Sequence, residues 1–212
     1  MSFENDPTAV KIIETYRANA PRSKSAFNMA AASLPGGDTR TMTSYQPFPL
    51  YFESGHNTRL KDIDGVWRED FLTNYGALIH GHDHHAIVAA VQAQMSKGTT
   101  PGGPSTLQYE HADMLKNLLP SMEKLRYCNS GTEATMWAIR AARAYTGREI
   151  IIKIDGGYHG THDWAHVNAF ITTGNNRSQA LEGLPPAHLA HGVPSSVLES
   201  VVAVPYNDAA TT

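Results

Sequence analysis

The chain has 212 residues, of which 41% are hydrophobic and 17% charged, with a formal net charge of -3 and a single cysteine. This composition is typical of a globular protein and excludes an intrinsically disordered chain. Because the basic residues are scattered, neither nucleic acid nor an anionic membrane surface is an expected partner. The sequence also lacks a membrane-length apolar run, a secretory leader pattern and a second cysteine for a disulfide, so we expect a cytoplasmic protein.

The first part of the chain combines helical and strand-like patterns. Apolar spacing predicts helices over residues 8–19 and 23–33, the second ended by Pro35-Gly36-Gly37. Three short strand-like segments follow, at residues 50–53, 59–63 and 66–72. Asp64-Gly65, between the last two, is a strong hairpin signal. We therefore expect a first domain, residues 1–75, of helices and a small antiparallel meander.

The rest of the chain, residues 76–212, alternates helices with strands. The expected helices span residues 84–97, 105–119 and 132–145, and the expected strands span 125–128, 149–154 and 197–204. This alternation predicts an α/β fold with a mostly parallel sheet, in which residues 172–194 form a long loop. Because no element follows the last strand to cover it, we expect an incomplete α/β domain from a longer protein, with exposed apolar surface and a tendency to associate.

A Ser-Gly-Thr sequence separates one predicted strand from the Ala-rich helix. Ser130, Gly131 and Thr132 would lie at the helix N-terminus, where backbone amides and the helix dipole favour an anion. Serine and threonine are also ordinary N-caps, and Glu133 in the first turn suits the same dipole. The tripeptide alone therefore predicts either an anion site or a simple cap.

A second loop, Gly156-Gly157-Tyr158-His159-Gly160, follows the next predicted strand. Open α/β sheets bind ligands at the carboxyl ends of their strands, so the two loops would face one crevice. There the ring of Tyr158 could stack on a planar cofactor, with His159 hydrogen-bonded to it. Alternatively, Tyr158 simply packs under its own loop.

These motifs together resemble a known family. NSGTEATMWAIRAARAYTGR, followed by a strand and GGYHG, is similar to the signature of class III pyridoxal-phosphate (PLP) aminotransferases of fold type I, in the branch of glutamate-1-semialdehyde aminomutase. LPGG, LKDIDGVWREDF, GHDHHAIVAAV and GGPSTLQYEHADML agree, so the resemblance covers about residues 34–208. It implies the N-terminal part of that fold, and a homodimer, because fold type I enzymes build each active site at a dimer interface.

The resemblance also implies roles for individual residues. Ser130, Gly131 and Thr132 would bind the PLP phosphate, and Tyr158 would stack on the pyridine ring, with His159 beside it. The Schiff-base lysine and the aspartate that pairs with the pyridinium nitrogen are expected beyond Thr212, so no catalytic residue is assigned in this chain. Lys153, in the middle of a predicted strand, receives no such role.

An earlier segment bears on the substrate. PGGDTRTMTSYQPFPLYF is similar to β-amino-acid (β-phenylalanine type) aminotransferases, in which an arginine in this context binds the substrate carboxylate. Here that residue would be Arg40; otherwise it is a solvated loop arginine. The resemblance thus implies an aminotransferase acting on an amino acid, with β-amino acids as candidate substrates and an oxo acid as acceptor. The alternatives are glutamate-1-semialdehyde 2,1-aminomutase and an inactive truncated fragment that retains only phosphate- or PLP-binding elements.

Other conspicuous residues have plainer interpretations. Imidazoles can bind metals, but no thiol or spaced carboxylate set accompanies the histidine-rich run, so we predict no metal site. That run contains His80, His82, His84 and His85. Met136 and Trp137 are interpreted as core or interface side chains, and Cys128 as a small apolar filler at the end of a buried strand.

Overall fold

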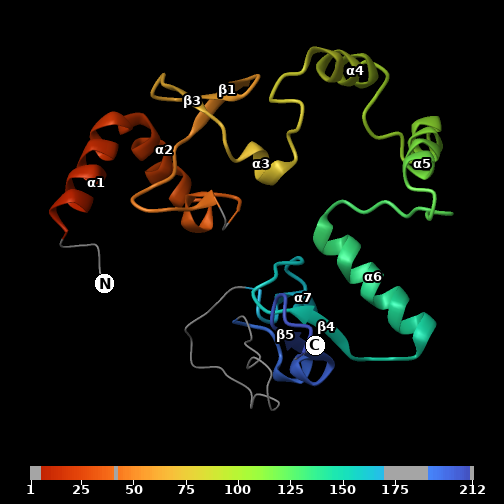
Figure 1. The fold of residues 1–212 in the computed structure, drawn as a ribbon. Coiled ribbons are helices and arrows are strands. Elements are labelled where there is room, and N and C mark those ends of the chain that lie inside the picture. Colours follow the sequence, from red (N-terminus) through yellow and green to blue (C-terminus); the bar gives the residue numbers. More distant parts are fainter. Residues whose placement is uncertain (1–5, 41–42, 170–190, 211–212) are drawn as a thin grey trace. The chain divides into compact units, whose positions relative to one another are not determined.

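A computed structural model of the chain describes residues 6–40, 43–169 and 191–210. The chain divides into two compact units, Met1–Pro104 and Ser105–Thr212 (Figure 1). A three-stranded sheet lies in the first unit and a two-stranded sheet in the second. The boundary between these units follows residue 104, and the functional division expected at residue 75 stays a prediction.

The first unit contains the expected helices and antiparallel meander. Its elements are α1 (Pro7–Asn19), α2 (Pro21–Ala31), the short 3-10 helix η2 (Pro35–Gly37), β1 (Phe52–His56), β2 (Arg59–Asp62), β3 (Trp67–Glu69), the short α3 (Thr73–Gly76) and α4 (His85–Met95). The central strand β2 pairs antiparallel with both neighbours, with Leu60 opposite Gly55 on one side and Arg68 on the other. The predicted meander is therefore confirmed, although its third strand is shorter than the sequence suggested.

The hairpin turn between β2 and β3 also fixes the start of α2. Gly65 has a φ of 94°, which a glycine adopts without strain, and its amide donates to the carbonyl of Asp62 at 2.9 Å. The neighbouring carboxylate of Asp64 accepts hydrogen bonds from the amides of Arg22 (2.7 Å) and Ser23 (3.0 Å). A side chain from the turn thus satisfies backbone donors in the first turn of α2, which has no side-chain cap of its own.

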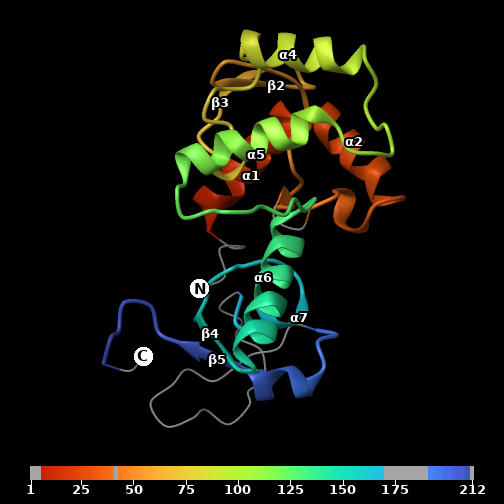
Figure 2. The same cartoon turned by 90° about the vertical axis from the view of Figure 1, so that its right-hand side faces the viewer.

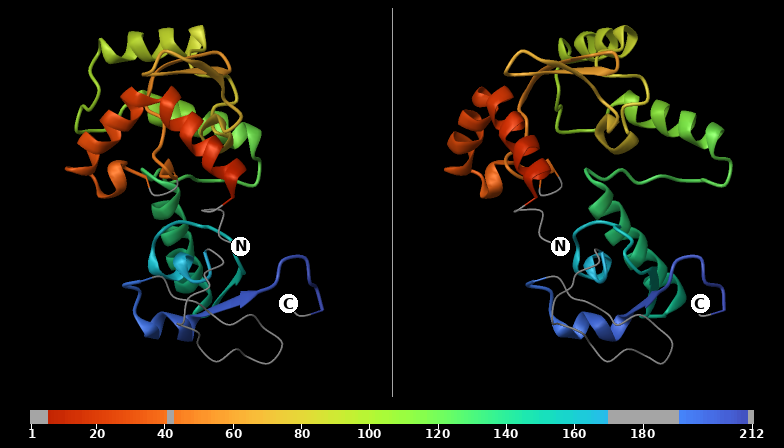
Figure 3. Two further views of the ribbon diagram at one scale, coloured as in Figure 1. Left: turned by 90° about the vertical axis from the view of Figure 1, so that its left-hand side faces the viewer. Right: turned by 60° about the vertical axis from the view of Figure 1, so that its left-hand side comes forward.

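The apolar centre of the first unit lies where α1 and α2 meet the segment before β1. Figure 3 shows α1 and α2 as an angled pair. Phe48 is buried, its ring centroid lies 5.2 Å from that of Tyr16 and 6.5 Å from that of Phe27, and the Tyr16 hydroxyl donates to the Phe48 carbonyl at 2.7 Å. Burial raises the pKa of Tyr16, so the phenol stays protonated as a donor.

The short element α3 is a left-handed turn. Thr73, Asn74 and Tyr75 have φ values of 47°, 50° and 58°, a region that non-glycine residues seldom occupy. Asp70 stabilises the entry to this turn, because one of its carboxylate oxygens accepts from the amides of Leu72 (2.9 Å) and Thr73 (3.0 Å).

The second unit contains the expected Ala-rich helix and a parallel pair of strands. Its elements are α5 (Thr106–Leu118), α6 (Gly131–Thr146), β4 (Ile151–Ile154), the short α7 (Asp163–His166), the 3-10 helix η4 (Ser195–Ser200) and β5 (Val201–Val204). β4 and β5 pair in parallel, with Ile151 opposite Val201 and Ile154 opposite Val204 (Figure 2). Gly147 ends α6 in the left-handed conformation, with a φ of 69°, as the sequence predicts.

Two of the predicted strands need correction. Residues 125–128 form no strand: within the described part of the chain no backbone ladder pairs with them. The predicted strand 197–204 begins as the 3-10 helix η4, and only Val201–Val204 are extended. Apolar runs alone do not distinguish a strand from a short helix, which explains the second error. Most of the predicted loop 172–194 lies outside the described residues.

A small apolar cluster holds the second unit together. Val167, Val197 and Val201 are buried, and Ile151, Trp164, Val193 and Leu198 pack against them. Lys153 is only 7% exposed, and its ammonium donates to the backbone carbonyls of Ala165, at 2.9 Å, and Val167. Burial lowers the pKa of Lys153, opposed by the nearby Asp155.

Many large apolar side chains of both units are exposed, as expected from the sequence. They include Ile87, Val91 and Met95 on α4 and Leu107, Met114 and Leu118 on α5. Association through these surfaces stays a prediction. Among the described helices, none has the length and apolarity that a bilayer crossing would require.

Candidate cofactor-binding site

The Ser-Gly-Thr motif lies at the N-terminus of α6. Ser130 is the N-cap: its side-chain oxygen accepts a hydrogen bond from the Glu133 amide at 3.1 Å. The Glu133 carboxylate in turn accepts from the amide of Asn129 at 2.6 Å. This reciprocal arrangement resembles a capping box and explains why the helix begins here. The plain N-cap interpretation is therefore correct for Ser130, although its hydroxyl proton can still be donated to a ligand.

The first turn of α6 also presents donors that capping does not use. Gly131 and Thr132 are the first two helical residues, whose amides have no carbonyl partner within the helix. A Cβ added to Gly131 would meet no atom within 4 Å, so space is open beside this residue. The Thr132 hydroxyl oxygen accepts from the Thr161 amide at 3.2 Å, which leaves its proton to point elsewhere. Open space, backbone amides and a hydroxyl donor at a positive helix end fit a phosphate group.

The second loop leaves β4 through a tight turn. The Gly157 amide donates to the Ile154 carbonyl at 3.1 Å, and Gly156 has a φ of 75°. The Gly156 amide also donates to the carbonyl of the buried Asn168 at 2.9 Å, and the Asn168 side-chain amide donates to Asp155 at 2.6 Å. The end of β4 is thereby tied to the segment after α7.

The two loops, which the sequence predicted to face one crevice, are in direct contact. Gly160 has a φ of 110°, and a Cβ added to it would lie 2.8 Å from the Thr132 Cα, so only glycine allows this approach. Thr135, one turn into α6, places its hydroxyl 2.8 Å from the His159 carbonyl. The contact brings the Tyr158-His159 segment against the N-terminal turn of α6.

Tyr158 and His159 differ in how they are held. Tyr158 is 52% exposed, so it is not enclosed beneath its own loop. The imidazole of His159 lies back on the loop, where a Cβ on Gly157 would come within 2.8 Å of its Nε2. The ring of Tyr158 is thus accessible to a flat ligand, whereas His159 contributes its carbonyl to the contact with α6.

Two residues of this region, Thr135 and His162, were not predicted from the sequence. The Thr135 hydroxyl lies 3.1 Å from His162 Nε2, and His162 Nδ1 accepts from the Ala165 amide at 3.4 Å as the N-cap of α7. Burial lowers the pKa of His162; Asp163 opposes this effect and Lys153 adds to it, so the ring favours the neutral form. The sequence did contain a signal for a helix start here, because in GTHDW, at the end of the glycine loop, the N-cap His162 directly precedes an aspartate.

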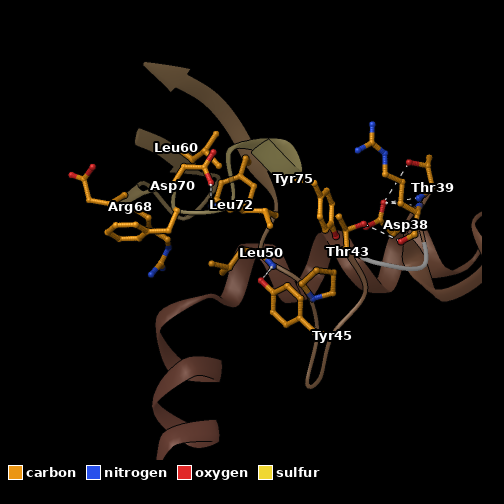
Figure 4. A pocket seen from close by; sticks show the side chains of 15 residues that line it. Asp38, Thr39, Thr43, Tyr45, Leu50, Leu60, Arg68, Asp70, Leu72 and Tyr75 are labelled. Atoms are coloured by element: carbon orange, nitrogen blue, oxygen red, sulfur yellow. Dashed lines mark hydrogen bonds between the residues drawn. The ribbon is translucent and has the colours of Figure 1, made fainter. Parts of the chain in front are cut away.

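Arg40 lies in the first unit, beside a hollow of about 760 Å³ (Figure 4). Aromatic and aliphatic side chains make up much of its lining. They include Tyr45, Leu50, Phe52, Leu60, Phe71, Leu72 and Tyr75. The Arg40 guanidinium is exposed and donates to the Asn74 side-chain oxygen at 3.0 Å, a neutral partner.

Asp38 forms hydrogen bonds with Thr39, Arg40 and Thr43. Its carboxylate accepts from the Thr43 hydroxyl and from the amides of Thr39 (2.6 Å) and Arg40 (3.4 Å) (Figure 4). These hydrogen bonds, the one from Thr43 foremost, lower the pKa of Asp38. The second arginine in the lining, Arg68, is paired with Asp62 at 2.7 Å. Arg40, without a carboxylate partner among the described residues, is therefore the better candidate for binding an added carboxylate.

Three further interpretations can be compared with the structure. The described residues contain no group of three or more His, Cys, Asp and Glu side chains arranged to hold a metal. Trp137 is 50% exposed, with the Arg140 guanidinium 4.9 Å from its ring, so it is not a core residue of this chain. Cys128 is half-buried but does not end a strand.

Comparison with known proteins shows the family to which the chain belongs. The structure has the fold of the N-terminal part of PLP-dependent transferases of fold type I. The Aminotransferase class-III family model matches residues 41–201, so the chain belongs to this family, whose members use PLP. The resemblance inferred from the NSGTEAT and YHG motifs is thereby confirmed.

Individual relatives carry different names. A glutamate-1-semialdehyde 2,1-aminomutase of Methanopyrus kandleri is 39% identical over 193 residues, 91% of this chain and 43% of that protein. A solved transaminase with PLP bound is 40% identical, with a TM-score of 0.79, over 89% of this chain and 42% of that one. A β-phenylalanine aminotransferase from Variovorax paradoxus is 30% identical, with a TM-score of 0.77, over 94% and 41%. This chain thus spans less than half the length of these relatives.

Proposed function

We propose that the whole protein is a PLP-dependent aminotransferase that acts on an amino acid, with β-amino acids as candidate substrates and an oxo acid as acceptor. The observation that carries the proposal is the contact between the N-terminus of α6 and the glycine loop after β4, joined through Thr132 and Thr161 at 3.2 Å. Family membership supports the cofactor, and Arg40 beside an aromatic hollow supports the substrate class.

The residues of this chain would bind and orient the cofactor. The amides of Gly131 and Thr132 and the hydroxyls of Ser130 and Thr132 would hold the phosphate through charge-assisted hydrogen bonds. The accessible ring of Tyr158 would stack on the pyridine and exclude water from one face. Bound PLP supplies an electron sink that stabilises negative charge at the substrate carbon bearing the amino group. Fixing both ends of the cofactor would keep that carbon aligned for proton transfer.

Two variants separate phosphate binding from helix capping. Ser130→Gly removes the hydroxyl but costs a cap only a few tenths of a kcal/mol, and Thr132→Val keeps the side-chain shape. Pyridoxamine 5'-phosphate is the probe, because it lacks the aldehyde that reacts with surface lysines. We expect the double variant to bind it about 10- to 100-fold more weakly, since a hydrogen bond to a charged group contributes about 1.5–3 kcal/mol. Unchanged affinity would return the tripeptide to the role of a simple cap.

Pyridoxamine without the phosphate is the matched ligand control. The difference in affinity between the two ligands measures the phosphate contribution alone. In the wild-type chain we expect the phosphorylated ligand to bind more tightly, and in the double variant we expect most of that difference to disappear. If the double variant keeps the wild-type difference in affinity between the two ligands, the phosphate binds to another part of the protein.

Arg40 is tested by kinetics of the whole enzyme. Arg40→Ala removes the guanidinium that would pair with a substrate carboxylate, so KM for β-phenylalanine should rise while PLP content stays the same. Arg40→Lys keeps the charge but not the bidentate fork, and should recover only part of the loss. Unaltered KM in Arg40→Ala would mean that this residue is a solvated loop arginine.

A second candidate is a glutamate-1-semialdehyde 2,1-aminomutase, which the names of curated relatives favour. An aminomutase moves an amino group between adjacent carbons of one substrate and needs no oxo-acid acceptor. Incubation of the whole enzyme with glutamate 1-semialdehyde alone, and separately with β-phenylalanine and a 2-oxo acid, distinguishes the two activities. If the 212-residue chain binds pyridoxamine 5'-phosphate but supports neither reaction, it is a binding-only fragment.

A further inference from the structure

A series of hydrogen bonds runs from the N-cap of α7 through α6 to the Tyr158 loop. It begins at the ring of His162, passes through the Thr135 hydroxyl and ends at the His159 carbonyl, with contacts of 3.1 Å and 2.8 Å. His162 is the N-cap that directly precedes α7, Thr135 lies in α6, and His159 lies in the loop after β4. One hydroxyl group on α6 therefore joins that helix to His159 and His162, two residues three positions apart in the stretch after β4.

The direction of each hydrogen bond follows from the helix cap. The Ala165 amide donates to the His162 carbonyl at 3.0 Å and, as the longer branch of a shared hydrogen bond, to His162 Nδ1 at 3.4 Å, so this nitrogen is an acceptor and carries no proton. In a neutral imidazole the proton then lies on Nε2, which donates to the Thr135 oxygen. The single hydroxyl proton of Thr135 must go to a carbonyl, and the carbonyl of His159 at 2.8 Å is closer than those of Gly131 (3.0 Å) and Thr132 (3.1 Å).

The end of this series coincides with the proposed cofactor site. His159 lies between Tyr158, the proposed stacking residue, and Gly160. Gly160 packs so closely on α6 that an added Cβ would lie 2.8 Å from the Thr132 Cα. Fixing the carbonyl of His159 fixes the peptide that joins His159 to Gly160. Through His159, this limits where the neighbouring Tyr158 can lie relative to the first turn of α6. The hydroxyl of Thr135 is directed to His159 and His162.

We propose that Thr135 and His162 are positioning residues that hold the Tyr158 loop in register with the phosphate-binding turn. This inference rests on the proposed function. It adds two side chains with defined hydrogen-bond directions: His162, in the Nε2–H tautomer, donates to Thr135, and Thr135 donates to the carbonyl of His159. The pair acts through Tyr158, so it affects recognition of the pyridine ring more than recognition of the phosphate.

The 15N chemical shifts of the His162 imidazole show which ring nitrogen carries the proton, and this measurement needs no ligand. The measurement uses the full 15N-labelled chain, with the His162 signals assigned by their absence in His162→Gln. We expect the Nε2–H tautomer in the wild-type chain and a mixture of tautomers in Thr135→Val, which removes the acceptor. A protonated Nδ1 in the wild-type chain, or an unchanged tautomer in Thr135→Val, would overturn the proposal.

Ligand affinity tests the positioning role. Thr135→Val should weaken binding of pyridoxamine 5'-phosphate about five- to tenfold, the effect of one hydrogen bond, and leave binding of inorganic phosphate unchanged. Thr135→Ser, which retains the hydroxyl, should restore affinity for pyridoxamine 5'-phosphate. Thr146→Val is the matched control, because Thr146 makes the same kind of bond to a carbonyl four residues earlier, at 2.8 Å, at the other end of α6.

The outcomes separate the two hypotheses. If the wild-type chain binds no pyridoxamine 5'-phosphate, the proposed function fails, and the tautomer measurement still decides the proton order. If the wild-type chain binds and Thr135→Val binds equally well, the positioning role is wrong while the proposed function stands. If Thr135→Val loses its fold by circular dichroism, Thr135→Ser decides: wild-type affinity supports the hydroxyl link and reduced affinity contradicts it.

Discussion

The buried carboxylate of Asp62 accepts hydrogen bonds from both Nε and Nη2 of Arg68, at 2.8 and 2.7 Å, across the hairpin of β2 and β3. Asp62 is 0% exposed, and the same carboxylate also accepts from the Val66 amide at 2.8 Å. A second pair on these strands, Arg59 with Glu69 at 2.8 Å, is about half exposed. The meander thus offers two ion pairs of the same chemistry, one with a fully buried carboxylate and one with an exposed carboxylate.

Arg68→Met should be much more destabilising than Arg59→Met. Removing Arg68 leaves a buried charge without its partner, which costs about 3 kcal/mol, whereas an exposed pair contributes about 0–1 kcal/mol. Urea denaturation of the full chain, followed by circular dichroism, gives both free energies of unfolding. Equal losses for the two variants would contradict the assigned difference between the pairs.

Lys153→Met should destabilise the second unit. The ammonium donates to the carbonyls of Ala165 and Val167, and methionine would leave these acceptors without their donor. An unsatisfied buried polar group costs about 1–3 kcal/mol. Lys124→Met is the control, because Lys124 is exposed in the same unit. A variant as stable as the wild type would mean that burying the charge costs as much as its hydrogen bonds contribute.

Gly160→Ala should separate the glycine loop from α6. The new Cβ would lie 2.8 Å from the Thr132 Cα, and the backbone φ of 110° disfavours alanine independently. We expect a lower free energy of unfolding and weaker binding of pyridoxamine 5'-phosphate. Gly103→Ala is the matched change, since a Cβ there meets nothing within 4 Å. If Gly160→Ala retains wild-type affinity for that ligand, the contact between the two loops is not needed for binding.

Acid should destabilise the folded chain through His162. Burial lowers the pKa of His162 below its ordinary value of 6.5, with Asp163 opposing and Lys153 adding to the effect. Below pH 6.5 the unfolded ring therefore takes up a proton that the folded ring resists, and stability is lost as the pH falls. His162→Gln should flatten this dependence between about pH 7 and pH 5, whereas His191→Gln, at an exposed position, should keep the wild-type slope. The same slope in all three proteins would contradict the assigned shift.

The sequence predicted most helices and the hairpin because their signals are local. Apolar spacing and Gly147 gave α6, and Asp64-Gly65 gave the turn between β2 and β3. Residues 125–128 were predicted as a strand on apolar character alone, but a strand exists only where another strand pairs with it. The start of β5 was misplaced for a related reason, since Val197 lies in a 3-10 helix that follows Pro194.

In the candidate site, too, local features could be predicted from the sequence and contacts between distant residues could not. The sequence by itself determined the family and the N-terminal turn of α6, because a cap, a glycine and a first-turn acid are encoded within a few residues. Only the tertiary structure decided that Gly160 packs on Thr132 and that His162 reaches Thr135, at 3.1 Å. Such contacts depend on where β4 and α7 bring distant segments of the chain, and hydrogen bonds between distant residues leave no periodic pattern in a sequence.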